Sequence, residues 1–231
     1  MKHLEENKIK KELERLSKHI NLKFQRKWFK VVWITKEQEI LTEYLSDCRD
    51  PIYEKYGKSL NKRIGNLEKF YQSVDYKNCI RRYGGQVIPK KSFFGFRKFV
   101  GKIKNKKVRE ILLEFCDKIE REFQDANKIA ALTETDIEKE KKALVYRILR
   151  HEWLHILLEE NKIKFKDWKY NEGLITYFEF YLDKSLGDLE KISRRETYEF
   201  NKEYFRKAIY FRKCLGADPQ AHKIKSLLNL K

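Results

Sequence analysis

Cysteine is scarce in this sequence, and its four copies are widely separated. They are Cys48, Cys79, Cys116 and Cys214. No two of them form a C-x-x-C pair, the usual spacing of a cysteine metal site or a redox motif. We therefore interpret them as free, mostly buried thiols, which are typical of a cytoplasmic protein.

Long apolar runs are also missing. No window approaches 18 consecutive apolar residues, and the N-terminus has no apolar segment of the signal-peptide kind. The sequence therefore predicts no transmembrane span and favours a soluble, cytoplasmic protein. No internal repeat or low-complexity segment is apparent. A length of 231 residues suits a single domain with a buried core.

Acidic residues are in deficit. The chain has 53 Lys and Arg against 35 Asp and Glu, a formal net charge of +18. Such a balance favours partners that are anionic: nucleic acid, a membrane surface or acidic polypeptides. The basic residues are spread along the chain, however, and only one Met is present. We therefore prefer the interpretation of a lysine-rich, thermophile-like surface, with nucleic-acid binding as an open alternative.

The most informative stretch is His151-Glu152-Trp153-Leu154-His155. On a helix, residues four apart lie on one face, so both imidazoles can reach one metal ion. In this H-E-x-x-H pattern the two His hold zinc, and Glu152 acts as general base on a zinc-bound water. With five His in the chain, about 0.016 chance matches are expected. The alternative is two ordinary surface or core histidines.

The residues around the motif predict a helix. Between Glu138 and Asn161 there is no Gly or Pro, and apolar residues recur at three-, four- and seven-residue steps. This periodicity is typical of a buried helix. Residues 133–136 form a break before it, and Thr133 or Thr135 could cap the helix.

A catalytic zinc site needs a third protein ligand, and Glu172 is the candidate. It lies in Asn171-Glu172-Gly173, which we expect at the start of a helix running to about Leu186, with Asn171 as N-cap. Glu172 would then project toward the preceding helix. The alternative is that Glu172 is only a first-turn acid favoured by the helix dipole.

These motifs together resemble the gluzincin zinc metallopeptidases, whose signature is H-E-x-x-H with a downstream Glu in an Asn-Glu-Gly run. The resemblance covers about residues 140–185. The short connection between the second His and Glu172 is similar to the compact members called minigluzincins. The resemblance implies zinc held by His151, His155 and Glu172, Glu152 as general base, a peptide or protein substrate, and a terminal segment that can block the cleft.

The expected fold class is α+β, mostly α-helical, with a small mixed or antiparallel sheet, a zincin-like active-site helix and a glutamate helix. We predict one metallopeptidase-like domain over 1–231, with a mostly helical N-terminal part (1–130) and a helical zinc-site part (134–231). Residues 22–35 are aromatic and β-branched and indicate a strand or hairpin. The resemblance implies that this strand presents substrate along a sheet edge.

Helices are further expected over 3–19, 36–47, 52–76, 108–131, 189–214 and 221–231. Residues 80–91 read as a loop with a short strand at 86–88. The segment 93–100 mixes aromatic and basic residues, which favours an aromatic cluster at a core edge, with a single-strand nucleic-acid groove as the alternative.

A peptidase of this kind also needs a donor that stabilises the oxyanion of the tetrahedral intermediate. The sequence does not choose among the candidates, which are Tyr177, Tyr198, Tyr204, Tyr210 and His222. The function we predict is zinc-dependent peptide-bond hydrolysis. The rival from another class is a basic, nucleic-acid-associated or regulatory protein with a non-catalytic zinc site. Oligomeric state does not follow from the sequence.

Overall fold

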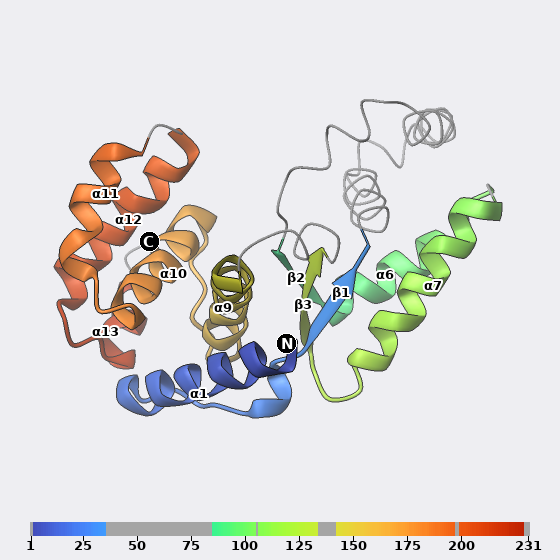
Figure 1. Ribbon diagram of the computed structural model, residues 1–231, viewed down its shortest axis with the longest axis horizontal. Helices are drawn as coiled ribbons and strands as arrows, with labels where there is room; N and C mark the ends of the chain where they lie inside the picture. Colours follow the sequence, from blue (N-terminus) through green and yellow to red (C-terminus); the bar gives the residue numbers. More distant parts are fainter. Residues whose placement is uncertain (1, 36–84, 105, 134–141, 197–198, 229–231) are drawn as a thin grey trace. The chain divides into compact units, whose positions relative to one another are not determined.

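Apolar periodicity and β-branched residues fold this chain into helices and one small sheet. A computed structural model describes residues 2–35, 85–104, 106–133, 142–196 and 199–228 (Figure 1). The described chain is mostly helical with a three-stranded mixed sheet, which confirms the expected α+β class. The expected helices over 36–47 and 52–76 lie outside the described residues. None of the described helices has an apolar run long enough to cross a bilayer.

The chain forms two compact units that do not follow its linear order. One unit comprises residues 30–145 and contains the sheet, while the other joins residues 1–29 to 146–231 and contains the two motifs. The N-terminal helix therefore belongs to the same unit as the H-E-x-x-H helix.

The sheet unit is built on three strands in the order β1-β3-β2. Its elements are β1 (Val31–Ile34), β2 (Gly85–Pro89), α6 (Lys90–Val100), α7 (Lys106–Glu122) and β3 (Lys128–Thr133). β1 runs parallel to β3, with Val32 opposite Ala131, and β2 runs antiparallel to it, with Ile88 opposite Ile129. One apolar core joins the side chains of α6 and α7 to alternate residues of β1 and β3 and to Ile88 of β2.

One expectation for this unit needs correction. The predicted helix over 108–131 ends at Glu122, and residues 128–133 form the central strand β3. The Ala-rich run Ile129-Ala130-Ala131-Leu132 has helix-forming composition, but pairing on both edges makes it a fully buried strand, which shows no alternation.

The segment 22–35, expected as a strand or hairpin, contains a 3-10 turn, η1 (Arg26–Trp28), and then the strand β1. Its strand pairs with distant β3. Among the described strands β1 is an edge, and its role in presenting substrate stays a prediction. Residues 93–100 form most of helix α6, and the expected strand at 86–88 lies within β2.

The other unit is all helical. Its elements are α1 (Lys2–Ile20), α9 (Lys142–Glu160), α10 (Trp168–Leu182), η2 (Leu186–Asp188), α11 (Leu189–Arg195), α12 (Glu199–Leu215) and α13 (Ala221–Leu228). The apolar stripe of α1 is buried at steps of three and four residues, at Ile9, Leu13, Leu16 and Ile20. Of the cysteines, Cys116 is buried and Cys214 exposed, both as free thiols, while Cys48 and Cys79 lie outside the described residues.

Candidate metal centre

Helix α9 carries the H-E-x-x-H motif. Its described residues contain neither Gly nor Pro, and Leu149, Trp153 and Leu157 are buried along its length. His151 and His155 lie one turn apart on the same face, with ring centroids 5.1 Å apart and planes inclined at 70°. Their side chains keep 25% and 20% of their surface exposed, so the face that they share is open to a small ligand.

Helix α10 brings Glu172 to this face. It begins at Trp168, because Asp167 is the N-cap and its carboxylate accepts a hydrogen bond from the backbone N–H of Lys169 at 2.9 Å. The expected N-cap, Asn171, instead lies inside the helix. Its side chain bonds both backbone groups of Phe165, at 2.8 and 3.0 Å, and so fixes the loop between α9 and α10.

The three predicted ligands come together. The Nε2 atom of His151 lies 3.2 Å from Oε2 of Glu172, and Nε2 of His155 lies 3.3 Å from Oε1 of the same carboxylate. One ligand atom from each of these three residues lies within 4.8 Å of the others. The structure thus converts a pattern spread over 22 positions into a single cluster of two imidazoles and one carboxylate.

This donor set fits zinc. Zinc binds imidazole nitrogen and carboxylate oxygen at about 2.0–2.2 Å, so two donors at a tetrahedral angle lie about 3.3 Å apart. The two imidazoles approach different oxygens of Glu172, at 3.2 and 3.3 Å, and one donor atom from each of the three residues lies within 4.8 Å of the others, which leaves one ion within reach of all three. Two His and one Glu also leave a fourth tetrahedral position for water or substrate, as catalytic zinc sites require.

Glu179 is a member of the site that sequence reasoning missed. Its Oε1 lies 3.4 Å from Nδ1 of His151, on the side of the ring away from Glu172. A carboxylate at Nδ1 holds a proton there, so that Nε2 is the nitrogen that gives up its proton when a metal binds. The signal was available, since Glu179 follows Glu172 by seven residues, two helical turns, on the same face of α10.

The charges of the cluster are strongly coupled. Burial disfavours the protonated ring of His151, but its contacts with Glu172 and Glu179 outweigh burial and raise its pKa to about 10. Burial of Glu172 is likewise outweighed by its hydrogen bonds with His151 and His155, which lower its pKa to about 2. The acidic environment therefore favours a cation between these side chains.

Glu152 is the next residue along α9 and is only 9% exposed. Burial raises the pKa of its carboxyl, while the charges of His151 and His155 offset part of that rise. A carboxylate with a raised pKa is a better proton acceptor at neutral pH than an exposed one. Its environment is therefore suited to the general-base role predicted for it.

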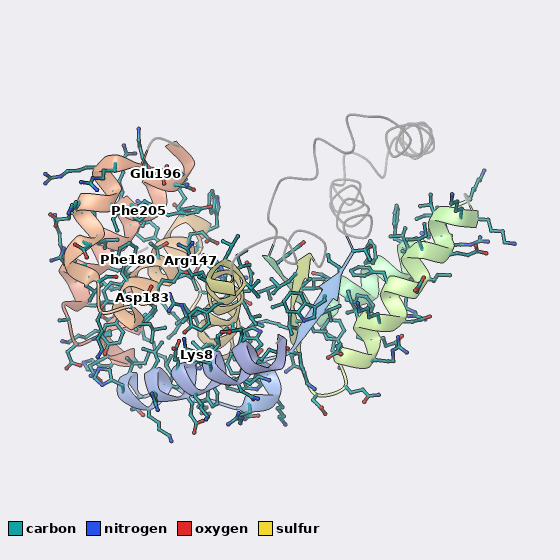
Figure 2. The ribbon with its side chains drawn as sticks, viewed as in Figure 1. Lys8, Arg147, Phe180, Asp183, Glu196 and Phe205 are labelled. Atoms are coloured by element: carbon teal, nitrogen blue, oxygen red, sulfur yellow. The ribbon has the colours of Figure 1, made fainter. Side chains whose placement is uncertain are left out.

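Two contacts fix α10 against its neighbours. Arg150, almost fully buried on α9, donates two hydrogen bonds of 2.7 and 2.8 Å to the carboxylate of Asp183, which follows α10 and is labelled in Figure 2. On the other side, Gly173 lies against α12, where an added Cβ would come within 2.2 Å of the Cβ of Lys207. The Gly of the Asn-Glu-Gly run therefore serves helix packing.

A cleft of about 180 Å³ opens directly beside His155 and Glu172. Its walls are mixed: Leu158, Ile163, Trp168 and Ile175 are apolar, and Glu159, Lys164 and Asn171 are polar. An apolar side chain placed beside the ligand cluster therefore has a space to occupy.

The oxyanion candidates separate in the structure. Tyr177 is buried and donates its hydroxyl hydrogen to the carbonyl of Gly216 at 2.8 Å, which commits it to structure. Tyr204 is the described candidate whose pKa responds to the cluster: burial and the charge of Glu172 raise it to about 12. Burial, together with Cys214 and Tyr170, raises the pKa of Tyr210, and no residue of the cluster is among the causes. His222 is exposed on α13, and Tyr198 lies outside the described residues.

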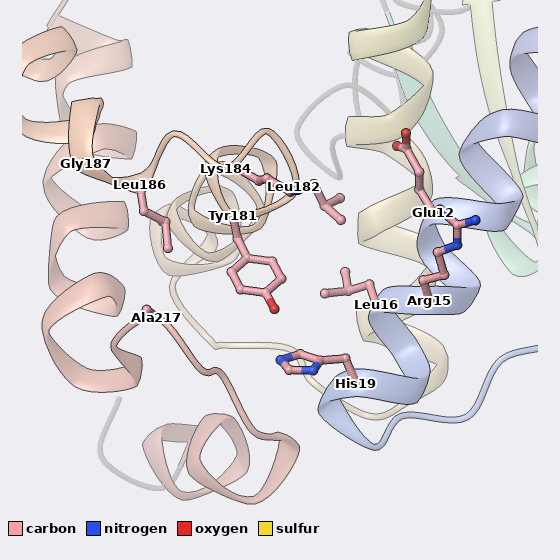
Figure 3. A pocket seen from close by; sticks show the side chains of 10 residues that line it. All are labelled: Glu12, Arg15, Leu16, His19, Tyr181, Leu182, Lys184, Leu186, Gly187 and Ala217. Atoms are coloured by element: carbon pink, nitrogen blue, oxygen red, sulfur yellow. The ribbon is translucent and has the colours of Figure 1, made fainter.

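A larger cavity, about 610 Å³, lies in the same unit, between α1 and the end of α10 (Figure 3). Tyr181 and His19 both line it, and their rings are stacked with centroids 5.9 Å apart. Nε2 of His19 lies 3.0 Å from Oδ1 of Asp218. None of the three predicted metal ligands lines this cavity.

Comparisons of the chain with protein-family models, curated proteins and solved structures find no match. The functional argument therefore depends on the geometry of the cluster.

Proposed function

We propose that this protein is a zinc-dependent metallopeptidase of the gluzincin type. The observation that carries the proposal is the His151–His155–Glu172 cluster, in which one ligand atom from each residue lies within 4.8 Å of the others, beside the buried carboxylate of Glu152. A structural zinc site usually has four protein ligands, often including Cys, whereas three ligands with an open position are typical of hydrolytic sites.

The chain's own residues divide the chemistry among them. Zinc bound there would polarise the scissile carbonyl and acidify a water. Glu152 takes the proton from the attacking water and delivers it to the leaving amine. Glu179 holds the proton on Nδ1 of His151 and keeps the ring oriented. The cleft beside His155 accepts an apolar side chain of the substrate.

Tyr204 is the favoured oxyanion donor. A tyrosine phenol is protonated at neutral pH and can donate a hydrogen bond to developing negative charge, and the charge of Glu172, which together with burial raises the pKa of Tyr204, indicates that this phenol is near the cluster. Its ring packs edge-on against Trp168, with centroids 5.7 Å apart, at the wall of the cleft. The substrate would be a peptide or protein, and we propose a cytoplasmic location because Cys116 and Cys214 are free thiols.

The first test is metal content by elemental analysis of protein purified without added metal. Wild type should hold about one zinc per chain, and Glu172→Ala should hold much less. Asp188→Ala, an exposed carboxylate on η2 of the same unit, is the matched control and should keep its zinc. A wild-type chain without zinc even after reconstitution refutes the metal site.

The second test separates catalysis from metal binding. Glu152→Gln should keep zinc but lose about 10²–10⁴-fold in the hydrolysis of fluorogenic peptides, because the amide cannot accept the proton. Full activity in this variant would contradict the role of Glu152 as general base. A zinc-loaded wild type that cleaves no peptide in a diverse library would favour the rival, a regulatory protein with a non-catalytic zinc site.

A further inference from the structure

The sheet unit contains a stretch with basic residues only. Between Gly85 and Arg109 the sequence has nine Lys and Arg and no Asp or Glu. A lysine-rich surface that serves solubility normally mixes both signs. This segment covers α6 and the connection to α7, and it does not include any residue of the metal centre.

Helix α6 has a buried face and an exposed face. Phe93, Phe96 and Val100 are at most 5% exposed and belong to the apolar core of the unit. At about 100° per residue, Lys91, Phe94 and Lys98 lie within about 60° of one another on the opposite face. Lys102 extends this line just beyond the helix. We call these four residues the α6 stripe: Lys91, Phe94, Lys98 and Lys102.

The cations of the stripe are available to a ligand. Acidic residues of α7 pair with other members of the basic segment: Asp117 and Glu120 with Arg97, and Glu110 with Lys106. Within the described part of the chain, Lys91, Lys98 and Lys102 take part in no ion pair, and all three are exposed. Lys91 and Lys98 lie about 10 Å apart along the helix axis.

Phe94 lies between these lysines and is 48% exposed, more than any other large apolar side chain in the described residues. Its ring contacts the ring of Phe93, with centroids 6.1 Å apart. A supported aromatic ring that stays open to solvent among cations has the composition of a base-stacking platform.

We propose that the α6 stripe binds single-stranded nucleic acid, with the three lysines on phosphates and Phe94 stacked on a base. Charge complementarity selects a polyanion, and the open ring selects one with unpaired bases. An anionic membrane fits less well, because membrane-surface helices insert an apolar face, and that face of α6 is already buried in the core.

The test is fluorescence anisotropy of the full chain with labelled 20-nucleotide oligo(dT) and oligo(rU), at several salt concentrations. Replacing Lys91, Lys98 and Lys102 by Gln should weaken binding roughly 50-fold at 0.15 M salt and reduce the salt slope by about 2, from three lost phosphate contacts. Replacing three exposed lysines of the other unit, Lys191, Lys213 and Lys223, removes the same charge and should leave affinity nearly unchanged.

The aromatic contribution has its own pair of variants. Phe94→Ala should weaken binding about tenfold, whereas Ile192→Ala, which removes an exposed apolar side chain from the other unit, should not. Circular dichroism checks that each variant is folded. Equal losses in the two triple variants, equal affinity for duplex and single strand, or binding to phosphatidylglycerol vesicles without binding to either oligonucleotide would each overturn the proposal.

Discussion

His151 is the residue on which the metal centre depends most, because both of its ring nitrogens face a carboxylate. Nε2 faces Glu172 at 3.2 Å and Nδ1 faces Glu179 at 3.4 Å. The two contacts are not equivalent: Glu172 shares the metal-binding side of the ring, while Glu179 fixes which nitrogen carries the proton. The ring is thereby oriented before any metal arrives.

Glu179→Gln tests this positioning role. The amide removes the charge at Nδ1 but keeps the shape of the side chain, so we expect the fold to persist and zinc affinity to fall about 10–100-fold. Competition with a chromophoric chelator measures that affinity. Glu190→Gln, at an exposed carboxylate on α11 that pairs with Arg212, is the control. Unchanged zinc affinity in Glu179→Gln would reduce the contact to an incidental ion pair.

At the scale of elements, the sequence predicts the metal helix and both outer strands of the sheet, but it assigns the central strand to a helix. The steps of the apolar residues and the four-residue His spacing are local, so they identify α9 without knowledge of the fold. Strand β3 is different. Its Ile-Ala-Ala-Leu core suits a helix locally and becomes a strand through pairing with β1, about 100 residues earlier in the chain, and with β2.

The start of α10 shows the same limit at shorter range. Asp167 and Asn171 both favour an N-cap, and they are four residues apart. The cap is Asp167, and Asn171 ties down the loop through the backbone of Phe165. The metal cluster itself could be predicted, while Glu179, whose place two helical turns after Glu172 was visible in the sequence, was missed. The partner of Gly173, by contrast, depends on tertiary packing.

Gly173→Ala tests the close approach of α10 and α12. The new methyl would lie 2.2 Å from the Cβ of Lys207, and that position is also near the Lys207 backbone, so the helices must separate. We expect a loss of about 1–3 kcal/mol in the free energy of unfolding, measured by urea denaturation. Gly187→Ala, whose added Cβ meets nothing within 4 Å, should change stability by less than about 0.5 kcal/mol.

A latent form, blocked by the C-terminal region, makes a different prediction for α12. Removal of the chain beyond Asn201 would activate a blocked enzyme. In the structure, however, Ala208 and Phe211 of α12 are fully buried. The ring of Phe205 also packs against that of Phe180 on α10, with centroids 6.1 Å apart (Figure 2). We therefore expect truncation to unfold the metal-centre unit rather than activate it, as seen by loss of cooperative thermal unfolding. A folded, more active truncation product would show that α12 is a removable block.

At the scale of the whole molecule, the two units divide the two kinds of chemistry. Every residue of the metal cluster lies in the unit formed by residues 1–29 and 146–231, and the whole α6 stripe lies in the unit of residues 30–145. The net charge of +18 therefore does not describe either region by itself. Around His151 the chain gathers acids that attract a cation, whereas along α6 it excludes them.

This division predicts where metal binding stabilises the chain. A ligand that binds only the folded state suppresses opening of the elements that hold it, by about 2.7 kcal/mol when its concentration is 100 times its Kd. Hydrogen exchange followed by mass spectrometry, with zinc and with a chelator, should show slower exchange with zinc in α9 and α10. In α6, α7 and β3 exchange should be the same in both conditions, because those elements contribute no ligand to the cluster. Glu172→Ala should abolish the difference. Protection spread evenly over both units would mean that they open together and that zinc stabilises the protein as one cooperative body.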